Sequence, residues 1–533
     1  MTLLRIVVLI CALFAVAATG PAAAAQAKPK PGGTFIIGIE GEPATATAHL
    51  ATDTAAIMTA VNVFNGLISL DFKFEPRPDL ADSWVNSKDG LTYTFELNKK
   101  ATWHDGKPVT AADVEFTFNE ILAKVHPRAS SWMNNIESTR ATGPHTVVIK
   151  LKAPYAPFMT VLGTVLSSGT LIMPKHVYQG TDPKTNPANQ RPIGSGPFKF
   201  VKWVKGQYIE LARNDKYFRP GRPYLDRIIV QFLPDAAARM LAFERGEVDF
   251  LHWYIVPYEQ VARLRKDARF QIVENGGEGA ATNEFLLMNL RNPYLKDVRV
   301  RRAIAHAVNR DEIIEKAVFK EGKVARGFVN SGVPWAYTDR FDLYRKPDLM
   351  KAEALLDEAG FKRGADGRRF TLRVAWATGR DYEGRAAELI RDYLRQVGID
   401  LKIESMDRAT FIDKIFKNWD FDLANQLFTT GPDPTVSVTP RYHTNQIKRV
   451  AFVNAMGYSN KDLDAVFDSE FKEQNRAKRA EMWRKAQEIL WNDLPALPLF
   501  EVPVINLVSG KFKDVITTPF GYIESRESAY QVK

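Results

Sequence analysis

The chain contains almost no cysteine. Its 533 residues include one, Cys11, which lies inside an apolar N-terminal run. The sequence therefore predicts a mature protein without disulfide bonds, since a core of this size does not need them even in an oxidising compartment. A lipoprotein needs a cysteine at its cleavage point, directly after a short box of small residues. Val8-Leu9-Ile10 precedes Cys11 and comes too early, so we expect no lipid anchor.

Long hydrophobic runs are missing after the N-terminus. No later segment reaches about 18 uninterrupted apolar residues, so no other part of the chain is expected to span a membrane. Arg5 precedes an apolar stretch over residues 6–18, and small residues then offer a signal-peptidase site after Ala25 or Ala27. An uncleaved anchor is the alternative, but the stretch is too short to span a bilayer comfortably. The sequence predicts a signal peptide over residues 1–25 and a periplasmic protein.

Charge of one sign dominates no segment. The formal net charge is +10, and it becomes +9 once the predicted signal peptide with Arg5 is removed. Because basic and acidic residues alternate throughout, a scattered solvated surface explains the excess, with attraction to anionic ligands or a membrane surface as the alternative. A long basic tract with interleaved aromatic residues is missing, which argues against nucleic acid as a partner.

Recognised catalytic motifs are also missing. Gly194-Ser195-Gly196 is not the G-x-S-x-G pattern, and the chain has no H-E-x-x-H, no Walker A sequence and no G-x-G-x-x-G that opens a helix. The eight histidines are dispersed. His49 and His443 could each meet a ligand or a metal, with surface or packing roles as the alternative. We expect a protein that is not an enzyme, with no catalytic residues, no metal site and no cofactor.

What is present is an alternation of strand and helix patterns. Residues 34–39 form a buried strand pattern, 92–97 alternate polar and apolar residues, and 236–244 follow a strand as a helix. Apolar residues over 386–397 recur at helical spacing until Gly398 ends the stripe, and a last long helix is expected over 475–490. Two α/β regions separated by a more β-rich insertion are predicted.

Several motifs follow one another in a distinctive order. Residues 77–84 read Arg-Pro-Asp-Leu-Ala-Asp-Ser-Trp, and residues 103–114 read Trp-His-Asp-Gly-Lys-Pro-Val-Thr-Ala-Ala-Asp-Val. The others are Pro192-Ile193-Gly194-Ser195-Gly196-Pro197-Phe198, Asn214-Asp215-Lys216-Tyr217-Phe218, Gly246-Glu247-Val248-Asp249, and the segments 297–310 and 351–360. Together they cover almost the whole mature chain and resemble the family 5 solute-binding proteins, the extracytoplasmic receptors of peptide-type ABC importers.

The resemblance implies an α/β, two-lobed periplasmic binding protein fold of the type II, cluster C-like kind, with an extra α+β domain inserted in the first lobe. The segments assigned to the first lobe are 34–72, 190–284 and 505–533, the inserted domain is 73–189, and the second lobe is 285–504. Trp84, Trp103 and His104 of the opening motifs are expected to pack within the insertion or at its junction, because such aromatic residues mostly belong to cores.

The resemblance also places a ligand carboxylate on an arginine just ahead of a long helix of the second lobe. Arg380 takes that position here, before the helical stripe over 386–397. Its planar guanidinium suits bidentate capture of a carboxylate. A surface arginine is the alternative.

The chain departs from the peptide-binding pattern where the ligand amine would be held. Peptide-binding members carry an aspartate shortly before an Asp-Pro pair, and alignment on Asp433-Pro434 puts Thr430 in its place. A hydroxyl offsets a buried ammonium poorly, and Asp433 would substitute only if the loop turns. A polar or anionic ligand beside Phe428, Thr429 and Thr430 is therefore favoured. N-blocked peptides, opines, amino-acid conjugates and oligosaccharides are candidates, and the nickel and haem carriers of the family rank lower.

Four further residues are candidates for the ligand site. Glu42 and Thr47 belong to the segment after the first strand, at a strand's carboxyl end, where open α/β sheets bind ligands. Trp335 and Tyr337 could stack on a ligand or line the mouth of the cleft. Local packing is the alternative for each.

The sequence thus predicts a monomeric periplasmic receptor that captures a peptide-like or opine-like solute between two lobes and delivers it to an inner-membrane ABC permease. A secreted hydrolase with an unrecognised active site, and a chaperone or sensor on the same fold, remain the alternatives.

Overall fold

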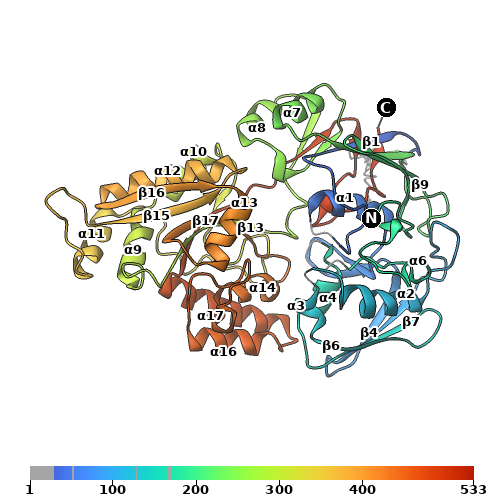
Figure 1. Ribbon diagram of the computed structural model, residues 1–533, viewed down its shortest axis with the longest axis horizontal. Helices are drawn as coiled ribbons and strands as arrows, with labels where there is room; N and C mark the ends of the chain where they lie inside the picture. The colour runs from blue at the N-terminus through green and yellow to red at the C-terminus, as the bar shows by residue number, and fades with distance from the viewer. Residues whose placement is uncertain (1–28, 51–52, 128, 166–169, 533) are drawn as a thin grey trace, which may run out of the picture.

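The computed structural model describes residues 29–50, 53–127, 129–165 and 170–532 (Figure 1). The predicted signal peptide, its cleavage sites and Cys11 lie outside these residues. Within the described ranges, none of the helices has the length and apolar character needed to cross a membrane.

The first large sheet brings together strands from three distant parts of the chain. Its seven strands lie in the order β12-β19-β11-β1-β10-β9-β8. The central strand β1 (Thr34–Ile39) is parallel to β10 (Arg227–Phe232) and to β11 (Phe250–Leu251). The remaining strands are β8 (Phe198–Val204), β9 (Tyr208–Arg213), β12 (Phe270–Val273) and β19 (Asn506–Ser509). This sheet is the core of the first lobe, and β1 occupies the residues that its apolar pattern predicted.

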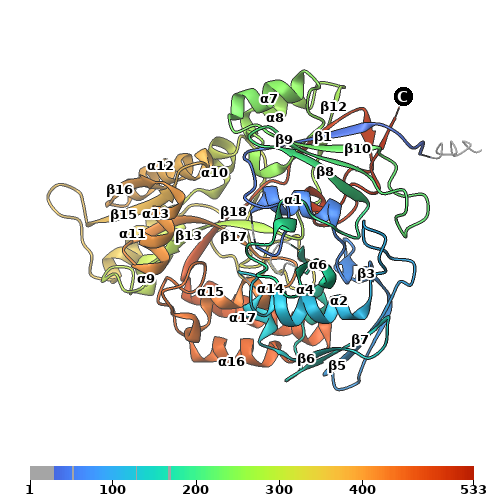
Figure 2. The same cartoon turned by 45° about the vertical axis from the view of Figure 1, so that its right-hand side comes forward.

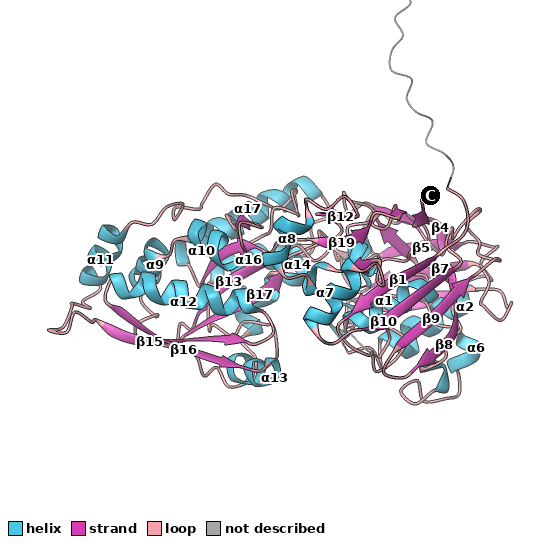
Figure 3. Ribbon diagram, turned by 90° about the horizontal axis from the view of Figure 1, so that it is seen from above, coloured by secondary structure: helices cyan, strands magenta, loops and turns pink. Residues whose placement is uncertain are grey.

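The second large sheet has six strands in the order β14-β18-β13-β17-β15-β16. All seven residues of β13 (Thr282–Met288) are buried, as expected for a strand that is covered on both faces. The other strands are β14 (Lys323–Val324), β15 (Phe370–Ala377), β16 (Ile399–Met406), β17 (Leu423–Thr429) and β18 (Ala496–Glu501). This sheet is the core of the second lobe, which lies at the opposite end of the long axis from the first (Figure 3).

A four-stranded antiparallel sheet, β4-β5-β7-β6, forms the third unit. Its strands are β4 (Ala81–Asn86), β5 (Thr92–Leu97), β6 (Ile136–Ala141) and β7 (Thr146–Leu151), and α2 (Ala111–Phe116) packs on one face (Figure 2). The unit interrupts the first lobe between β1 and β8, and this arrangement confirms the predicted α/β fold class with an inserted domain. The residue limits assigned to the three domains stay a prediction.

The helices cover these sheets and fill the connections. Those of the first lobe and the insertion are α1 (Thr54–Val63), η1 (Thr117–Leu122), α3 (Ser130–Met133), α4 (Phe158–Leu162), α6 (Lys175–Tyr178), α7 (Ala236–Glu244) and α8 (Tyr258–Leu264). Those of the second lobe are α9 (Val298–Ala307), α10 (Arg310–Ala317), α11 (Leu349–Glu358), α12 (Asp381–Gln396), α13 (Arg408–Ile412), η4 (Asp413–Lys417), α14 (Pro434–Ser437), α15 (Thr439–Tyr442), α16 (Lys461–Glu470) and α17 (Arg476–Asp493).

Helix α12 shows why the sequence pattern was informative. Buried Ala386, Ile390 and Leu394 recur along the face that packs on the second sheet, as the helical spacing predicted. Gly398 follows with a φ of +83°, a left-handed conformation that glycine adopts without strain, and it ends the helix where the sequence indicated. The helix begins five residues before the predicted stripe, with acidic residues in its first turn, and this places Arg380 directly at its N-terminus.

The chain passes between the two large sheets at two adjacent places. Residues 274–281 connect β12 to β13, and residues 502–505 connect β18 to β19. The insertion also touches the second lobe: the Ala156 N–H donates to the Phe471 carbonyl at 3.0 Å, and Arg476 Nη1 lies 2.6 Å from Glu75 Oε1. Figure 1 shows α16 and α17 beside α3 and α4 at this contact. The lobes therefore meet at a two-strand hinge and at a second contact on the insertion.

The aromatic residues of the 77–84 and 103–114 motifs have the structural role that was expected. Trp103 is 1% exposed and Trp84 is half-buried. His104 accepts a hydrogen bond at Nδ1 from the Gly194 N–H, at 3.2 Å, and its Nε2 lies 3.0 Å from the Gly196 carbonyl. Because Nδ1 accepts a bond, the ring is neutral and Nε2 carries its proton. The motif therefore ties the insertion to the Gly-Ser-Gly turn.

Burial of His104 has a consequence for acid stability. Burial lowers the pKa of His104 to about 4, against about 6.5 when unfolded. A base with a depressed folded pKa contributes stability above its unfolded pKa, and this contribution is lost as the pH falls toward 4. We expect the wild-type protein to lose about 3 kcal/mol more unfolding free energy than His104→Gln between about pH 7 and pH 4. Urea unfolding of both proteins measures this difference, and equal losses would contradict the assignment.

Candidate functional site

A cavity of about 760 Å³ lies between the two lobes. The first lobe contributes the residue after β1, the start of α1, α7 and the segment before and within α8. The second lobe contributes the start of α12 and the loop after β17. The cavity thus lies at the carboxyl ends of β1, β15 and β17, the edge at which open α/β sheets bind ligands. The side chains used below are Glu40, Thr54, Arg239, Tyr254, Tyr258, Arg380, Thr429 and Asp433.

Arg380 is the principal cation of the second-lobe wall. Its side chain is 29% exposed, and Nη1 donates to Glu383 Oε1 at 3.0 Å. Within the described part of the chain this is the one hydrogen bond of its guanidinium, so the remaining N–H donors are available to a ligand. Glu383 is fully buried and one turn further along α12. The pair fixes the guanidinium at the cavity wall while leaving part of its donor set unused.

Three ionisable side chains, Glu284, Glu383 and Arg408, surround Arg380 on its protein side. Glu284 of β13 is fully buried, and Arg408 at the start of α13 is half-buried, with its Nη1 3.1 Å from Gln426 Oε1. Burial raises the pKa of Glu284 well above its ordinary value, and the nearby Glu383 carboxylate raises it further, against the opposing effect of Arg380 and Arg408. Burial likewise raises the pKa of Glu383, although its Arg380 partner opposes the shift. Arg380 therefore belongs to a cluster of two carboxyl groups and two guanidinium groups.

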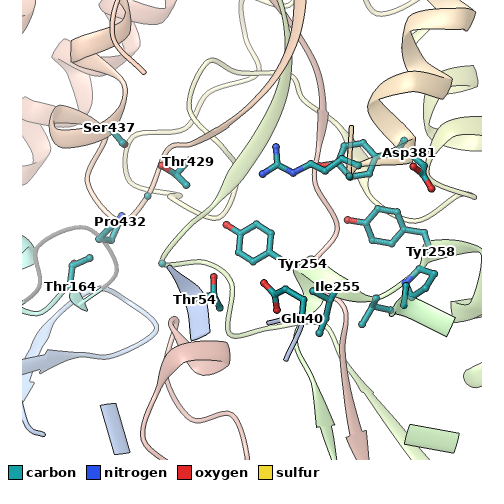
Figure 4. Close-up of a pocket in the computed structure, with 18 of the residues that line it drawn as sticks. Glu40, Thr54, Thr164, Tyr254, Ile255, Tyr258, Asp381, Thr429, Pro432 and Ser437 are labelled. Carbon is teal, nitrogen blue, oxygen red and sulfur yellow. The ribbon is translucent and has the colours of Figure 1, made fainter. Parts of the chain in front are cut away.

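The first-lobe wall carries an acid and aromatic rings. Glu40 Oε2 lies 3.0 Å from His252 Nε2. Burial opposes ionisation of Glu40, but the hydrogen bond and charge of His252, together with Arg239, lower its pKa to about 2. Tyr254 stacks on Trp253 with ring centroids 3.6 Å apart. Figure 4 shows the Glu40 carboxylate and the Thr54 and Tyr254 hydroxyl groups directed into the same space. This wall presents an ionised carboxylate and hydroxyl groups opposite the arginine.

Three of the residues predicted from the sequence line this cavity: Arg380, Thr429 and Asp433. Asp433 is 2% exposed, accepts from Arg479 Nη2 at 2.8 Å and from the Thr435 N–H at 3.0 Å, and caps α14. Its charge is therefore already paired, and its capping role matches the turn-forming alternative.

Two predicted residues lie behind the wall. Thr430 is fully buried; its hydroxyl donates to the Ala281 carbonyl at 2.7 Å and accepts from the Asn330 N–H at 3.0 Å. Phe428 is 4% exposed and packs against Phe285. Neither lines the cavity in this conformation.

The other four predicted residues lie away from the cavity. Glu42 accepts from Trp203 Nε1 at 2.7 Å and from the Gly206 N–H at 3.1 Å. Thr47 is fully buried with its hydroxyl 2.9 Å from that of Thr45. Trp335 packs under the guanidinium of Arg479, at 4.8 Å, and Tyr337 is half-buried near Glu501. For Glu42, Thr47 and Trp335 the contacts match the local-packing alternative.

Sequence reasoning missed Arg239, Tyr254 and Tyr258. They follow the ends of β10 and β11, the same carboxyl edge that produced the prediction for the first strand. The strand before the two tyrosines has only two residues, which is too short for its alternation to be recognised. These residues could have been found by treating the residues after every predicted strand, including very short strands, as candidates for the ligand site.

The serine and the two histidines singled out from the sequence make contacts within the protein. Ser195 is 1% exposed and donates to Asn65 Oδ1 at 3.1 Å. His49 is buried with its ring edge against Tyr178, and His443 lies 3.3 Å from Asp464 and 3.2 Å from Asp468. In the described ranges, groups of three or more His, Cys, Asp or Glu side chains that could hold a metal ion are not found.

Known proteins resemble this chain over nearly its full length. Residues 75–449 match the model of the bacterial extracellular solute-binding proteins, family 5, middle region. The oligopeptide-binding protein AppA of Bacillus subtilis strain 168 is 29% identical over 484 residues, which are 88% of this chain and 86% of AppA. A structure of B. subtilis AppA in complex with a nonapeptide has a TM-score of 0.77, 27% identity, and coverage of 95% of this chain and 100% of AppA.

Two further solved structures are similar. The ABC transporter substrate binding protein CtaP of Listeria monocytogenes has a TM-score of 0.82 and 26% identity, covering 95% of this chain and 100% of CtaP. AgaA of Agrobacterium tumefaciens R10, in complex with agropinic acid, has a TM-score of 0.76 and 25% identity, covering 94% of this chain and 99% of AgaA. With a two-lobed fold, an inter-lobe cavity and a family match over more than half its length, this chain belongs to family 5 of the bacterial extracellular solute-binding proteins.

Proposed function

We propose that this solute-binding receptor captures a small acidic solute, peptide-like or opine-like, with a carboxylate of the ligand on Arg380. The observation that carries this proposal is the guanidinium itself. It lies at the wall of the inter-lobe cavity, is only partly exposed, and uses one N–H group on Glu383. An arginine with unused donors in a partly desolvated site is well suited to a carboxylate, which it can bind through two parallel hydrogen bonds.

A second cation supports an acidic ligand. Arg441 of α15 is 3% exposed and donates from Nη2 to the carbonyl of Thr429, which lines the cavity. Its guanidinium carbon lies 4.1 Å from the centre of the Phe428 ring, and its buried Nη1 has no hydrogen-bond partner among the described residues. Arginine stays protonated in proteins, so this buried charge adds a positive potential behind the wall.

The cavity also limits the size of the ligand and the places where a ligand amino group can bind. A volume of about 760 Å³ is within the usual range for small-molecule sites. The Thr430 hydroxyl is occupied by backbone groups and Asp433 by Arg479, so neither is free to hold an ammonium group. Glu40 is an ionised acid on the opposite wall, which Glu259 also lines. A free amino group, if the ligand has one, is therefore expected on the first-lobe side.

Transport follows from closure of the two lobes. The two hinge segments, 274–281 and 502–505, are the only chain passages between the large sheets within the described residues, so rotation about them changes the cavity's width. A ligand that touches both walls binds the closed form better and shifts the population toward it. We propose that an inner-membrane ABC permease recognises this closed form of a monomeric, periplasmic, non-lipidated protein.

A thermal-shift screen tests the ligand class. Each acidic peptide, opine or amino-acid conjugate is compared with its carboxamide, and each free amine with its N-acetyl form. A true ligand at about 100 times its dissociation constant is expected to add about 2.7 kcal/mol of stability, and its carboxamide much less. Turnover of peptides or glycosides without saturable binding, lost on treatment with a chelator or a serine-directed reagent, would instead support a hydrolase.

A further inference from the structure

Glu284 is a buried acid that the proposed binding of a ligand carboxylate by Arg380 does not use. It lies on β13, at the centre of the second sheet, and its exposed fraction is 0%. The residues opposite it are Leu427 on β17 and Phe500 on β18, and neither can pair with a charge. Within the described part of the chain, neither of its carboxyl oxygens has a hydrogen-bond partner.

The charged groups that act on Glu284 come from two helices. Glu383 and Arg380 belong to the start of α12, and Arg408 begins α13. Tyr382 of α12 and Tyr258 of α8 face each other in the same cluster, with ring centroids 5.8 Å apart. Both are un-ionised at neutral pH, since tyrosine ordinarily ionises near pH 10 and burial raises their pKa values further. Glu383 Oε1 accepts a hydrogen bond from Arg380, and its buried Oε2 has no hydrogen-bond partner among the described residues.

This arrangement disfavours a second negative charge. A carboxylate without hydrogen bonds in a protein interior is strongly unfavourable, and a second carboxylate nearby makes it more so. The two arginines oppose this effect only partly, because Arg380 already pairs with Glu383 and Arg408 donates to Gln426. A proton on Glu284 removes the difficulty, since a neutral acid is far less costly to bury than an ion.

We propose that Glu284 is a neutral carboxylic acid in the resting receptor and that its neutrality gives the Arg380 cluster the net positive charge that attracts the ligand. With Glu284 neutral, Arg380 and Arg408 outnumber Glu383 and the cluster carries one net positive charge. With Glu284 ionised, the cluster carries none. Glu284 is thus a positioning residue that acts through Arg380, and the inference rests on the proposed role of Arg380 as the carboxylate partner.

The proposal predicts the direction in which the affinity for an anion changes with pH. An anion is attracted to the cluster while Glu284 holds its proton, and the attraction weakens when a rising pH removes that proton. Affinity for a carboxylate should therefore fall as the pH rises through the raised pKa of Glu284. In Glu284→Gln the side chain stays neutral at every pH, so this part of the pH dependence should disappear.

Infrared difference spectroscopy tests the proton without any ligand. Spectra of the mature receptor labelled with ¹³C-glutamate are recorded at neutral pH for the wild type, Glu284→Gln and the matched control Glu383→Gln. Burial also raises the pKa of Glu524 to about 7, so the wild-type band has more than one source. We expect the difference between the wild type and Glu284→Gln to contain the carbonyl band of a protonated glutamic acid, and the difference between the wild type and Glu383→Gln to lack it. Absence of the band in the wild type, or its loss only in Glu383→Gln, overturns the proposal. Absence of the band from the wild type overturns the proposal even if a variant fails to fold, whereas a band that is present is assigned to Glu284 only by its loss in Glu284→Gln.

Titration with acetate tests the link to Arg380, with acetamide as the neutral probe. The Arg380 Nε–H signal, assigned by its loss in Arg380→Ala, is followed by NMR across the pH range in which the infrared band of Glu284 disappears. The apparent dissociation constant for acetate is expected to rise about tenfold in the wild type and to stay constant in Glu284→Gln. A persistent acid band with a pH-independent affinity overturns the role of Glu284. No response to acetate in either protein overturns the carboxylate role of Arg380, while the infrared band still reports the proton separately.

Discussion

Replacing Arg380 with alanine is expected to weaken binding of an acidic ligand by about 2 to 5 kcal/mol, or about 30-fold to about 5,000-fold. The loss has two parts: the ligand carboxylate loses its paired hydrogen bonds, and it is left in a partly dry site without a compensating charge. The same substitution also releases Glu383, which is fully buried and loses its only charged hydrogen-bond partner. Calorimetric titration with the acidic ligand found by the screen measures the change.

Two further variants serve as controls: one keeps the positive charge at position 380 without the guanidinium shape, and the other removes a different arginine. Arg380→Lys keeps a positive charge but not the planar fork, so an intermediate loss is expected. Arg385→Ala removes another arginine of the same cavity; its Nε is used on the Ala317 carbonyl and its guanidinium carbon lies 5.0 Å from the centre of the Phe319 ring. It should weaken binding far less than Arg380→Ala. Unchanged affinity in Arg380→Ala would refute the carboxylate role.

Replacing Gly194 with alanine is expected to destabilise the protein by about 3 kcal/mol, at the upper end of the range for overpacked sites. A Cβ atom at this position would lie 1.8 Å from the Val63 carbonyl oxygen, at the end of α1. The clash involves backbone atoms, which cannot rotate away as a flexible side chain would. The same oxygen accepts a hydrogen bond from the Gly196 N–H at 2.8 Å, so moving it breaks a second contact.

Gly41→Ala is the matched control, because a Cβ atom there would have no neighbour within 4 Å. Its free energy of unfolding, measured with urea, should lie within about 0.5 kcal/mol of the wild-type value. Equal midpoints for the Gly194 and Gly41 variants would show that the turn tolerates a side chain. The prediction assigns the Gly-Ser-Gly segment to the junction of the first lobe and the insertion, where it supports packing.

The residues around Asp433 illustrate how a family pattern can mislead about a ligand. Alignment on the Asp-Pro pair placed Thr430 at the position of an amine-binding aspartate. In the structure Thr430 bonds the backbone of the hinge segment and of the loop at Asn330, while Asp433 pairs with Arg479 of α17. The loop is thus fastened to its own lobe at both positions. Of the three neighbouring candidates Phe428, Thr429 and Thr430, Thr429 alone lines the cavity.

The sequence by itself determined the family, the fold class and the position of Arg380. Each rests on local information: ordered motifs, the period of apolar residues in strands and helices, and a helical stripe whose end is marked by Gly398. The predicted strand at 34–39 and the helix at 236–244 therefore match the structure residue for residue. Packing of buried aromatic residues such as Trp103 follows from the same rule, since large apolar side chains are buried somewhere in any fold.

Only the tertiary structure decided which residues meet across the cavity. Glu40, Tyr254 and Arg380 are separated by more than a hundred residues or lie on different lobes, and no local pattern records that they share one space. The same holds for Glu284 and Glu383, whose mutual effect depends on how α12 packs over the second sheet. Electrostatic interactions and burial depend on distance in space, whereas a sequence records distance along the chain. The ordered motifs therefore pointed to a receptor, and packing alone decided which charged side chains line its cavity.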